Sequence, residues 1–351
     1  MDKVLNLYKQ PGETPLECIL RYKENNPQFE NVPMTYAGRL DPLAEGVLLV
    51  LSGKEVHRKE EFLNLKKEYE VEVLFGFETD TYDVLGFVKE HKTLFRQKFF
   101  WARKFFAKNF LRSHINCCCN FMRPHLGSSA SGLAKARQCF LTSSPRPTGA
   151  VHLLDKIFVN SILSQKLLRC FNTYLSLPRP TKTSALNEFY SADFNKAKAV
   201  KTLRDFIGKN IFEYPQYSSK PVNGKPLFSL ARSGELGDVE MPKREVEIYN
   251  LEILNWREIN SKDLLKDIEN KISNVVGDFR QEVIVSKWRE ILINTDCNFS
   301  IVKIKAEVSS GTYMRTLAHE WGKALGIPAL AYHIVRTKVG EYYVSESDKS
   351  L

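Results

Sequence analysis

The sequence lacks a membrane-spanning segment, a targeting signal and a disulfide framework. None of its 351 residues lies in a run of about eighteen apolar side chains, the length that a helix needs to cross a bilayer. The N-terminal stretch MDKVLNLYKQ has neither an apolar signal core nor an arginine-rich amphipathic presequence. The seven cysteines are odd in number and irregularly spaced. These absences predict a cytoplasmic protein that is not embedded in a membrane.

Acidic side chains are nearly missing from residues 91–190. This stretch holds 16 of the 51 lysines and arginines but only two of the 41 acidic residues, Asp155 and Glu188. The rest of the chain is therefore slightly acidic, although the whole carries a net charge of +10. A nucleic-acid site outside this stretch must depend on locally clustered basic side chains, because no global positive field supports it.

The same stretch shows little periodicity. It contains five of the seven cysteines and eleven of the 22 phenylalanines, around a Ser/Pro/Gly-rich centre at 127–149. We interpret 91–190 as an insertion between two halves of one domain, 1–90 and 191–351. A disordered or mistranslated segment is the favoured interpretation, and a basic RNA-binding arm with salt-dependent affinity is the alternative.

A metal site in the insertion is a third interpretation, and it is disfavoured. The spacing lacks a C-x-x-C pair, and adjacent cysteines cannot easily all reach one tetrahedral ion. We therefore predict that the protein holds no metal. The ligands of such a site would come from His114, Cys117, Cys118, Cys119 and His125.

The two flanking halves show regular α/β patterns. Residues 68–75 and 301–308 alternate apolar with polar side chains, which predicts two strands, and residues 46–51 form a short apolar run typical of a buried strand. The inward side chains of the alternating strands would be Tyr69, Val71, Val73, Phe75, Val302, Ile304, Ala306 and Val308.

Apolar residues at helical spacing predict two helices in the second half. One lies at 198–209, with Val200, Leu203, Phe206 and Ile207 on its apolar face. The other follows the turn at 309–311, with Thr312 as N-cap and Gly326 at its end. Its apolar stripe would consist of Met314, Leu317, Ala318, Trp321 and Leu325.

Residues 36–48 (YAGRLDPLAEGVL) place an aspartate on a stiff turn before the apolar run. Pro42 disfavours the α region for Asp41, and Gly38 and Gly46 allow tight backbone turns. A precisely aimed catalytic carboxylate is usually mounted in this way. From the spacing alone, an ordinary Asp-Pro surface turn is an equally good interpretation.

This stretch resembles the GxLDPxAxGvL motif of the TruB-type pseudouridine synthases. Further blocks of that family follow in the same order, and together they cover roughly 1–90 and 195–345. Residues 67–86 resemble its K-x-Y and T-D-T-x-D-x-x-G block, 215–232 its P-x-Y-S…G-K…A-R block, 310–317 its G-T-Y-I-R-T-L helix and 335–337 its late R-T strand.

The resemblance implies a fold and an activity. The fold would be mixed α/β, with a largely antiparallel central sheet that forms the floor of a cleft and is flanked by helices. The reaction would convert one uridine in the T-loop of tRNA (position 55) to pseudouridine. It detaches uracil from C1′, rotates it and reattaches it through C5, so neither a redox change nor a cofactor is needed.

The resemblance also implies roles for three residues. Asp41 would be the nucleophile. Tyr69 would stack on the flipped uracil, although an ordinary inward-facing strand aromatic is the alternative. Arg315 would pair with Asp41, and it is unusual on physical grounds because the dipole of a helix disfavours a cation in its first turn. We therefore predict the Arg315 guanidinium within hydrogen-bonding distance of the Asp41 carboxylate; a solvated surface arginine is the alternative.

Three further residues match the substrate-binding positions of the family. Tyr313 and Ile334 would line the uridine pocket, or else simply pack in the core. Tyr36 stands where the family has a histidine that packs against the T-loop, and a tyrosine can still stack there. Because the sequence ends soon after Tyr343, we expect no C-terminal RNA-binding domain of the kind that many relatives carry. We expect a monomer without an obligatory protein partner.

Two other functions are compatible with these motifs. One is an RNA-guided synthase of the dyskerin type, which shares the catalytic domain. The other is a non-catalytic RNA-folding or RNA-binding protein on the same scaffold, although the presence of Asp41, Tyr69 and Arg315 together argues against it. Mapping of pseudouridine in a bare tRNA transcript separates all three.

Overall fold

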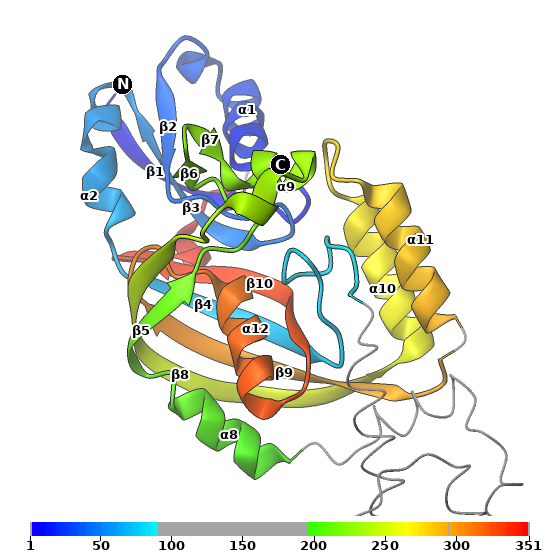
Figure 1. Cartoon of the computed structure of the whole chain (residues 1–351). Helices are drawn as coiled ribbons and strands as arrows, with labels where there is room; N and C mark the ends of the chain where they lie inside the picture. Colours follow the sequence, from blue (N-terminus) through cyan, green and yellow to red (C-terminus); the bar gives the residue numbers. More distant parts are fainter. Residues whose placement is uncertain (1, 90–194, 294, 350–351) are drawn as a thin grey trace, which may run out of the picture. The chain divides into compact units, whose positions relative to one another are not determined.

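The computed structural model describes residues 2–89, 195–293 and 295–349, so the predicted insertion at 91–190 lies outside the described residues. The described strands form a nine-stranded sheet and a small two-stranded sheet (Figure 1). In chain order the strands are β1 (Lys3–Lys9), β2 (Met34–Ala37), β3 (Glu45–Ser52), β4 (Lys67–Phe75), β5 (Gly208–Glu213), β6 (Pro221–Val222), β7 (Lys225–Pro226), β8 (Lys243–Asn260), β9 (Asn298–Val308), β10 (Ala329–Val339) and β11 (Tyr342–Tyr343).

Strands from both sides of residues 90–194 share the large sheet. Its order is β1-β3-β10-β4-β9-β8-β5, with β2 paired to β3 and β11 paired to β10. Among the described strands, β3 and β10 form the only parallel pair, which joins Val335 to Glu45 and Arg336 to Gly46. The expected mixed fold with a largely antiparallel sheet is therefore confirmed.

The strands predicted from alternation are present. β4 buries Tyr69, Val71 and Val73 on one face, and β9 buries the residues from Val302 to Val308 that alternate with charged ones. The apolar run at 46–51 lies within β3, where it is buried from Gly46 onward. Alternation predicts such strands well because successive side chains of a strand point to opposite faces of the sheet.

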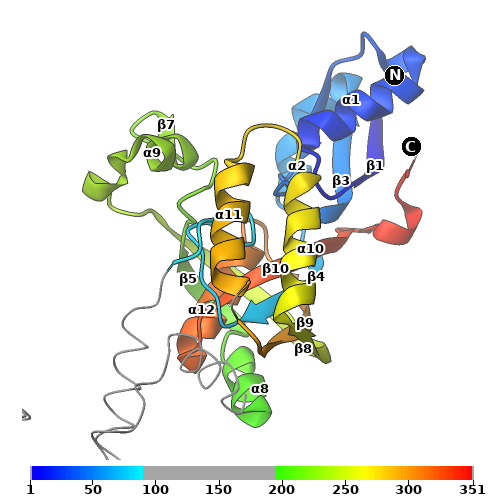
Figure 2. The ribbon, with the colours of Figure 1, turned by 90° about the vertical axis from the view of Figure 1, so that its right-hand side faces the viewer.

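Helices cover both faces of this sheet (Figures 1 and 2). α12 and α8 pack on the face that carries Val71 and Ile304, and α10 and α11 pack on the opposite face against Leu74 and Leu330. The α-helices are α1 (Pro15–Asn25), α2 (Lys59–Leu63), α8 (Lys196–Arg204), α9 (Leu227–Ser233), α10 (Ser261–Ser273), α11 (Gln281–Leu292) and α12 (Met314–Leu325). Short 3-10 helices are η1 (Pro27–Phe29), η2 (Gly53–Arg58), η3 (Glu235–Asp238) and η4 (Val344–Glu346).

Two details of the predicted helices are wrong. The helix expected at 198–209 ends at Arg204, because Gly208 at φ +106° begins β5 and leaves Ile207 45% exposed. The N-cap of α12 is Tyr313 rather than Thr312. The Thr312 hydroxyl donates to the Ser309 carbonyl at 3.0 Å, within the preceding turn. The predicted apolar stripe of α12 is buried throughout.

Within the described residues, no helix combines the length and the apolar character that a membrane crossing requires.

Candidate active site

Asp41 lies in the turn that leads from β2 into β3. The Ala44 amide donates to the Asp41 carbonyl at 3.0 Å, which closes the turn, and 29% of the Asp41 side chain is exposed. Gly46 follows at φ +106°, and a Cβ there would lie 2.3 Å from the Arg336 carbonyl oxygen. Only glycine therefore lets β3 approach β10 this closely at the point where the Asp41 turn meets the sheet.

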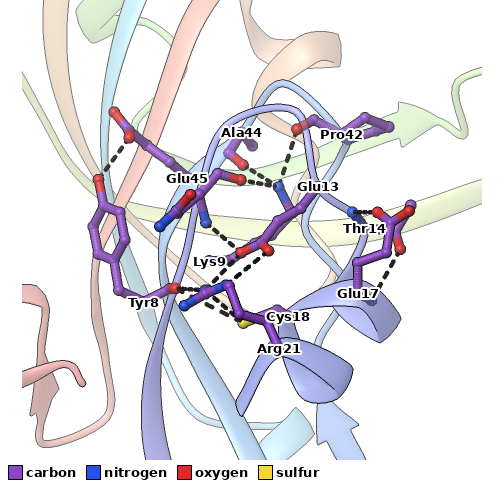
Figure 3. A network of polar contacts seen from close by, with 11 residues as sticks. Tyr8, Lys9, Glu13, Thr14, Glu17, Cys18, Arg21, Pro42, Ala44 and Glu45 are labelled. Atoms are coloured by element: carbon purple, nitrogen blue, oxygen red, sulfur yellow. Dashed lines mark hydrogen bonds and ion pairs between the residues drawn. The ribbon is translucent and has the colours of Figure 1, made fainter. Parts of the chain in front are cut away.

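A buried lysine holds this turn from one side (Figure 3). Lys9 Nζ donates to three carbonyl oxygens, those of Gln10 at 2.9 Å, Pro42 at 3.0 Å and Ala44 at 2.6 Å. The Gly12 amide also donates to the Pro42 carbonyl, at 2.8 Å. Burial lowers the pKa of the Lys9 ammonium to about 8. The three bonds compensate part of the cost of burying the charge, and they fix the carbonyls on either side of the turn.

A buried arginine holds the chain on both sides of the same turn. Arg336 is 1% exposed, and its Nε donates to the Val47 carbonyl at 2.7 Å. Its Nη2 donates to the Gly38 carbonyl at 3.2 Å. The segments that precede and follow Asp41 are thus tied to β10 by one rigid guanidinium.

The predicted contact between Arg315 and Asp41 is confirmed. Arg315 is the second residue of α12 and is 3% exposed. Its Nε donates to Asp41 Oδ2 at 2.7 Å and its Nη2 to Asp41 Oδ1 at 2.8 Å, a bidentate pair. Nη1 donates to the Thr81 carbonyl at 2.8 Å, and Nη2 is also 3.4 Å from the Tyr217 carbonyl. Both carboxylate oxygens of Asp41 are therefore fixed in direction.

A second carboxylate, that of Asp83, lies beside the same guanidinium. Its Oδ2 is 3.8 Å from Arg315 Nε, and its Oδ1 accepts from the Thr81 hydroxyl at 2.6 Å and the Leu85 amide at 3.0 Å. Burial raises the pKa of Asp83 to about 6. Burial opposes the charge of Arg315 as well, but the negative charges of Asp41 and Asp83 raise the pKa of Arg315 above its usual value.

Of the predicted pocket residues, Tyr313 lies beside Arg315, and Tyr69 and Ile334 pack in the apolar cluster that contains the sequence neighbours of the pair. Tyr69 and Ile334 are each 7% exposed and belong to the same apolar cluster, which also contains Leu40 from the Asp41 turn. The Tyr313 ring centroid is 6.0 Å from Arg315 Cζ. Burial and, to a smaller extent, the negative charge of Asp41 raise the pKa of Tyr313.

Tyr36 packs in a different apolar cluster from Tyr69 and Ile334. It lies in β2, its ring packs with the cluster that includes Leu48 and Val50, and Lys59 Nζ is 5.6 Å from the ring centroid. The contacts found for Tyr36 therefore place it with α1 and α2, and they do not connect it to the Asp41–Arg315 pair.

The sequence predictions missed three charged residues of this site: Lys9, Asp83 and Arg336. Asp83 and Arg336 lie in two of the quoted motif blocks, which was the available signal, whereas Lys9 lies outside all of them. Their partners are mostly backbone carbonyls, which carry no mark in a sequence.

The described residues contain no group of three or more His, Cys, Asp or Glu side chains that could hold a metal ion. The histidines and cysteines of the disfavoured metal site, from His114 to His125, lie outside the described residues.

Comparisons with known proteins point to one family. The sequence model described as "TruB family pseudouridylate synthase (N terminal domain)" matches residues 28–104 and 178–275. The tRNA pseudouridine synthase B of Staphylococcus saprophyticus is 31% identical over 164 residues, which cover 47% of this chain and 40% of that protein. The protein of the same name from Deinococcus radiodurans is 30% identical over 148 residues, which cover 42% of this chain and 44% of that protein.

A longer match has lower identity. The tRNA pseudouridine synthase B of Aquifex aeolicus is 22% identical over 347 residues, which cover 99% of this chain and 71% of that protein. The first two matches span less than half of the relatives' own length. A chain in the crystal structure of a Cbf5-Nop10-Gar1 complex aligns with 97% of this chain and 49% of its own length, at 14% identity and a TM-score of 0.41.

The family match includes the Asp41 turn, β4 with Tyr69, and the loop that holds Asp83. In the structure the Asp41 turn and the loop that holds Asp83 meet at the buried guanidinium of Arg315. The chain belongs to the TruB family of pseudouridylate synthases.

Proposed function

We propose that this protein isomerises a uridine of tRNA to pseudouridine, and that its target is the T-loop uridine at position 55. The observation that carries the proposal is the bidentate Asp41–Arg315 pair, in which a buried guanidinium aims a carboxylate that remains 29% exposed. The name of the relatives, tRNA pseudouridine synthase B, supports tRNA as the substrate.

The reaction needs one nucleophile and a pocket that holds the detached base. Asp41 attacks either C1′ or the uracil ring, the N1–C1′ bond breaks, and the base turns; C5 then bonds to C1′ and the covalent bond to Asp41 breaks. C5 then loses its proton and N1 gains one, so the product is an isomer of the substrate and no cofactor takes part. Tyr69 stacks on the flipped uracil, and Ile334 and Tyr313 limit its movement.

The orientation of the carboxylate is the main contribution of Arg315. Two parallel N–H bonds hold both oxygens of Asp41, and the guanidinium is itself held by the Thr81 carbonyl. A nucleophile that is oriented before the substrate arrives does not have to be reorganised during the reaction.

The test is pseudouridine mapping in a bare tRNA transcript incubated with the purified protein alone, which also tests whether a monomer without partners suffices. The wild-type protein should modify the T-loop uridine and no other position. Asp41→Asn should form no detectable pseudouridine while binding tRNA within about threefold of wild type, because the change is nearly isosteric. Asp205→Asn, an exposed carboxylate at the end of α8, is the matched control and should be fully active.

Full activity of Asp41→Asn would overturn the assignment of the nucleophile. Modification that appears only after a guide RNA and partner proteins are added would replace the proposal with an RNA-guided synthase. Tight tRNA binding without modification by the wild type, under any of these conditions, would indicate an RNA-binding protein.

A further inference from the structure

α10 and α11 form a hairpin whose tip, residues 274–280, reaches the surroundings of the Asp41 turn. Figure 2 shows the tip between α9 and the segment that leads into α1. The Val276 amide donates to the Gly12 carbonyl at 3.0 Å, and Arg232 Nη2 donates to the Asp278 carbonyl at 3.1 Å. Gly12 lies so close to the tip that a Cβ there would be 2.2 Å from the Asn274 carbonyl oxygen.

Arg280, the last residue of the tip, brings several segments together. Its guanidinium carbon is 4.4 Å from the ring centroid of Phe87 and 4.8 Å from that of Tyr217, so it lies against both rings. Nη1 donates to the Tyr217 hydroxyl at 3.0 Å, and Nη2 is 3.5 Å from Asp80 Oδ2. The Arg280 side chain is 29% exposed and that of Asp80 is 19% exposed. Contacts of this kind between a planar guanidinium and two rings are specific to arginine.

The residues that contact Arg280 are direct neighbours of the groups that hold Arg315. Asp80 precedes Thr81, whose carbonyl accepts from Arg315 Nη1 at 2.8 Å. Tyr217 itself offers its carbonyl to Arg315 Nη2 at 3.4 Å. The tip is also linked to the Asp41 turn through Gly12. The Gly12 carbonyl accepts from the Val276 amide of the tip, and the Gly12 amide donates to the carbonyl of Pro42, the residue after Asp41.

The backbone conformation of Arg280 also supports a role for its side chain. Its φ of +64° lies in the left-handed region, which glycine or asparagine occupies more readily than arginine does. The turn is braced by the Gln281 side chain, which donates to the Gly277 carbonyl at 2.6 Å and accepts from the Phe279 amide at 2.8 Å. A strained arginine at this position indicates that its side chain is needed there.

We propose that Arg280 is a positioning residue, through which the tip of the α10–α11 hairpin fixes the Asp80–Thr81 segment and Tyr217 and thereby the orientation of Arg315 toward Asp41. The kinetic part of this inference rests on the proposed function. The structural part does not, since it concerns the order of residues 79–88 and 214–218 in the protein alone.

Three variants separate the contributions of Arg280. Arg280→Gly removes the side chain and suits the left-handed backbone, so it does not introduce strain. Arg280→Lys keeps the charge but loses the planar fork. Asp80→Asn removes the charge of the partner yet keeps Oδ1, which accepts from the Phe87 amide at 2.7 Å. Arg289→Ala is the control, because Arg289 is an exposed arginine of α11 that pairs with Glu269 on α10.

The first measurement is amide hydrogen exchange of the full chain. Arg280→Gly should speed exchange in 79–88 and 214–218 by about tenfold, Arg280→Lys by less, and Arg289→Ala not at all. The second is the single-turnover rate with saturating tRNA. Arg280→Gly should lower this rate by about tenfold while the Kd for tRNA stays within about twofold, and Asp80→Asn combined with Arg280→Gly should lose little more than the single variants.

Unchanged exchange in both segments of Arg280→Gly would overturn the inference. So would a raised Kd for tRNA with an unchanged saturated rate, because that result would make Arg280 an RNA contact. If the wild-type protein forms no pseudouridine, the proposed function fails, and the exchange measurement still decides whether Arg280 orders the two segments.

Discussion

A single buried guanidinium has four protein acceptors at this site. Arg315 donates to both oxygens of Asp41 and to the Thr81 carbonyl, and the Tyr217 carbonyl lies within reach. Asp83 adds a second negative charge at 3.8 Å. The dipole of a helix disfavours an arginine near its N-terminus. Here the attraction of two carboxylates outweighs that effect, because they lie within 4 Å of a buried guanidinium and water screens them little.

Substitution of Arg315 should therefore separate charge from geometry. Arg315→Lys keeps a cation near Asp41 but cannot bond both oxygens in parallel, so it should retain only part of the single-turnover rate. Arg315→Met should retain almost none, and it should lower the free energy of unfolding by about 3–5 kcal/mol because Asp83 is left buried without its counter-charge. Rapid-quench kinetics with saturating tRNA and urea denaturation measure the two effects. A wild-type rate for Arg315→Met would show that the pair is not catalytic.

Asp83 should make stability depend on pH. Burial raises its pKa to about 6 from an ordinary value of 3.8. Between these values the folded chain keeps a proton that the unfolded chain has released, so the contribution of this group to stability is full below about pH 4 and is lost as the pH rises through 6. In urea denaturation from pH 7 to pH 4, the wild type should gain on the order of 2 kcal/mol relative to Asp83→Asn. Parallel stability curves for the two proteins would contradict this expectation.

At the scale of elements, the sequence predicted those strands and helices whose hydrophobic pattern lies within one continuous segment. The alternation in β4 and β9 and the stripe of α12 were correct because each is a repeating pattern within one segment. The Asp41–Arg315 contact was predicted through a family resemblance and a dipole argument. The role of Lys9 was not predicted, because two of its three acceptors are carbonyls of a turn more than thirty residues away, which the pairing of β1 with β3 brings close.

Loss of Lys9 should loosen the whole Asp41 turn. Lys9→Met leaves the Ala44 and Pro42 carbonyls without the lysine donor in a buried setting, which should cost about 1–3 kcal/mol of unfolding free energy. The single-turnover rate should fall more than tRNA affinity does. Lys23→Met on α1 is the matched control, since Lys23 also donates to backbone carbonyls, but these belong to Glu30 and Val32 outside the Asp41 turn, and Lys23 is less buried. Equal effects of both changes on the rate would contradict a specific role for Lys9.

At the scale of the whole molecule, the segments on either side of residues 90–194 alternate within one sheet. β10 lies between β3 and β4, and β9 lies beside β4. All residues that we assign to the site come from these two segments. The described sheet is thus built jointly by the segments before and after residues 90–194.

Deletion of residues 95–185, with a short flexible linker in their place, should leave a soluble and active protein. Long surface insertions change folding free energy little, because the entropy of closing a loop grows slowly with its length. Circular dichroism melting and pseudouridine mapping, with the full chain as control, test this expectation. An unfolded deletion variant would show that the stretch belongs to the core and that the division into 1–90, 91–190 and 191–351 is wrong.

The parallel pairing of β3 with β10 has a consequence for how the protein is made. Among the described strands, β1, β2 and β3 join the rest of the large sheet only through β10, which lies near the other end of the chain. These first strands leave the ribosome early, yet the edge on which they dock does not exist until β10 has been translated. Asp41 is mounted between two of them, so in a nascent chain that lacks β10 the proposed nucleophile is not yet held beside its guanidinium partner, Arg315. The described sheet around Asp41 is therefore not complete before residues 329–339 have been synthesised.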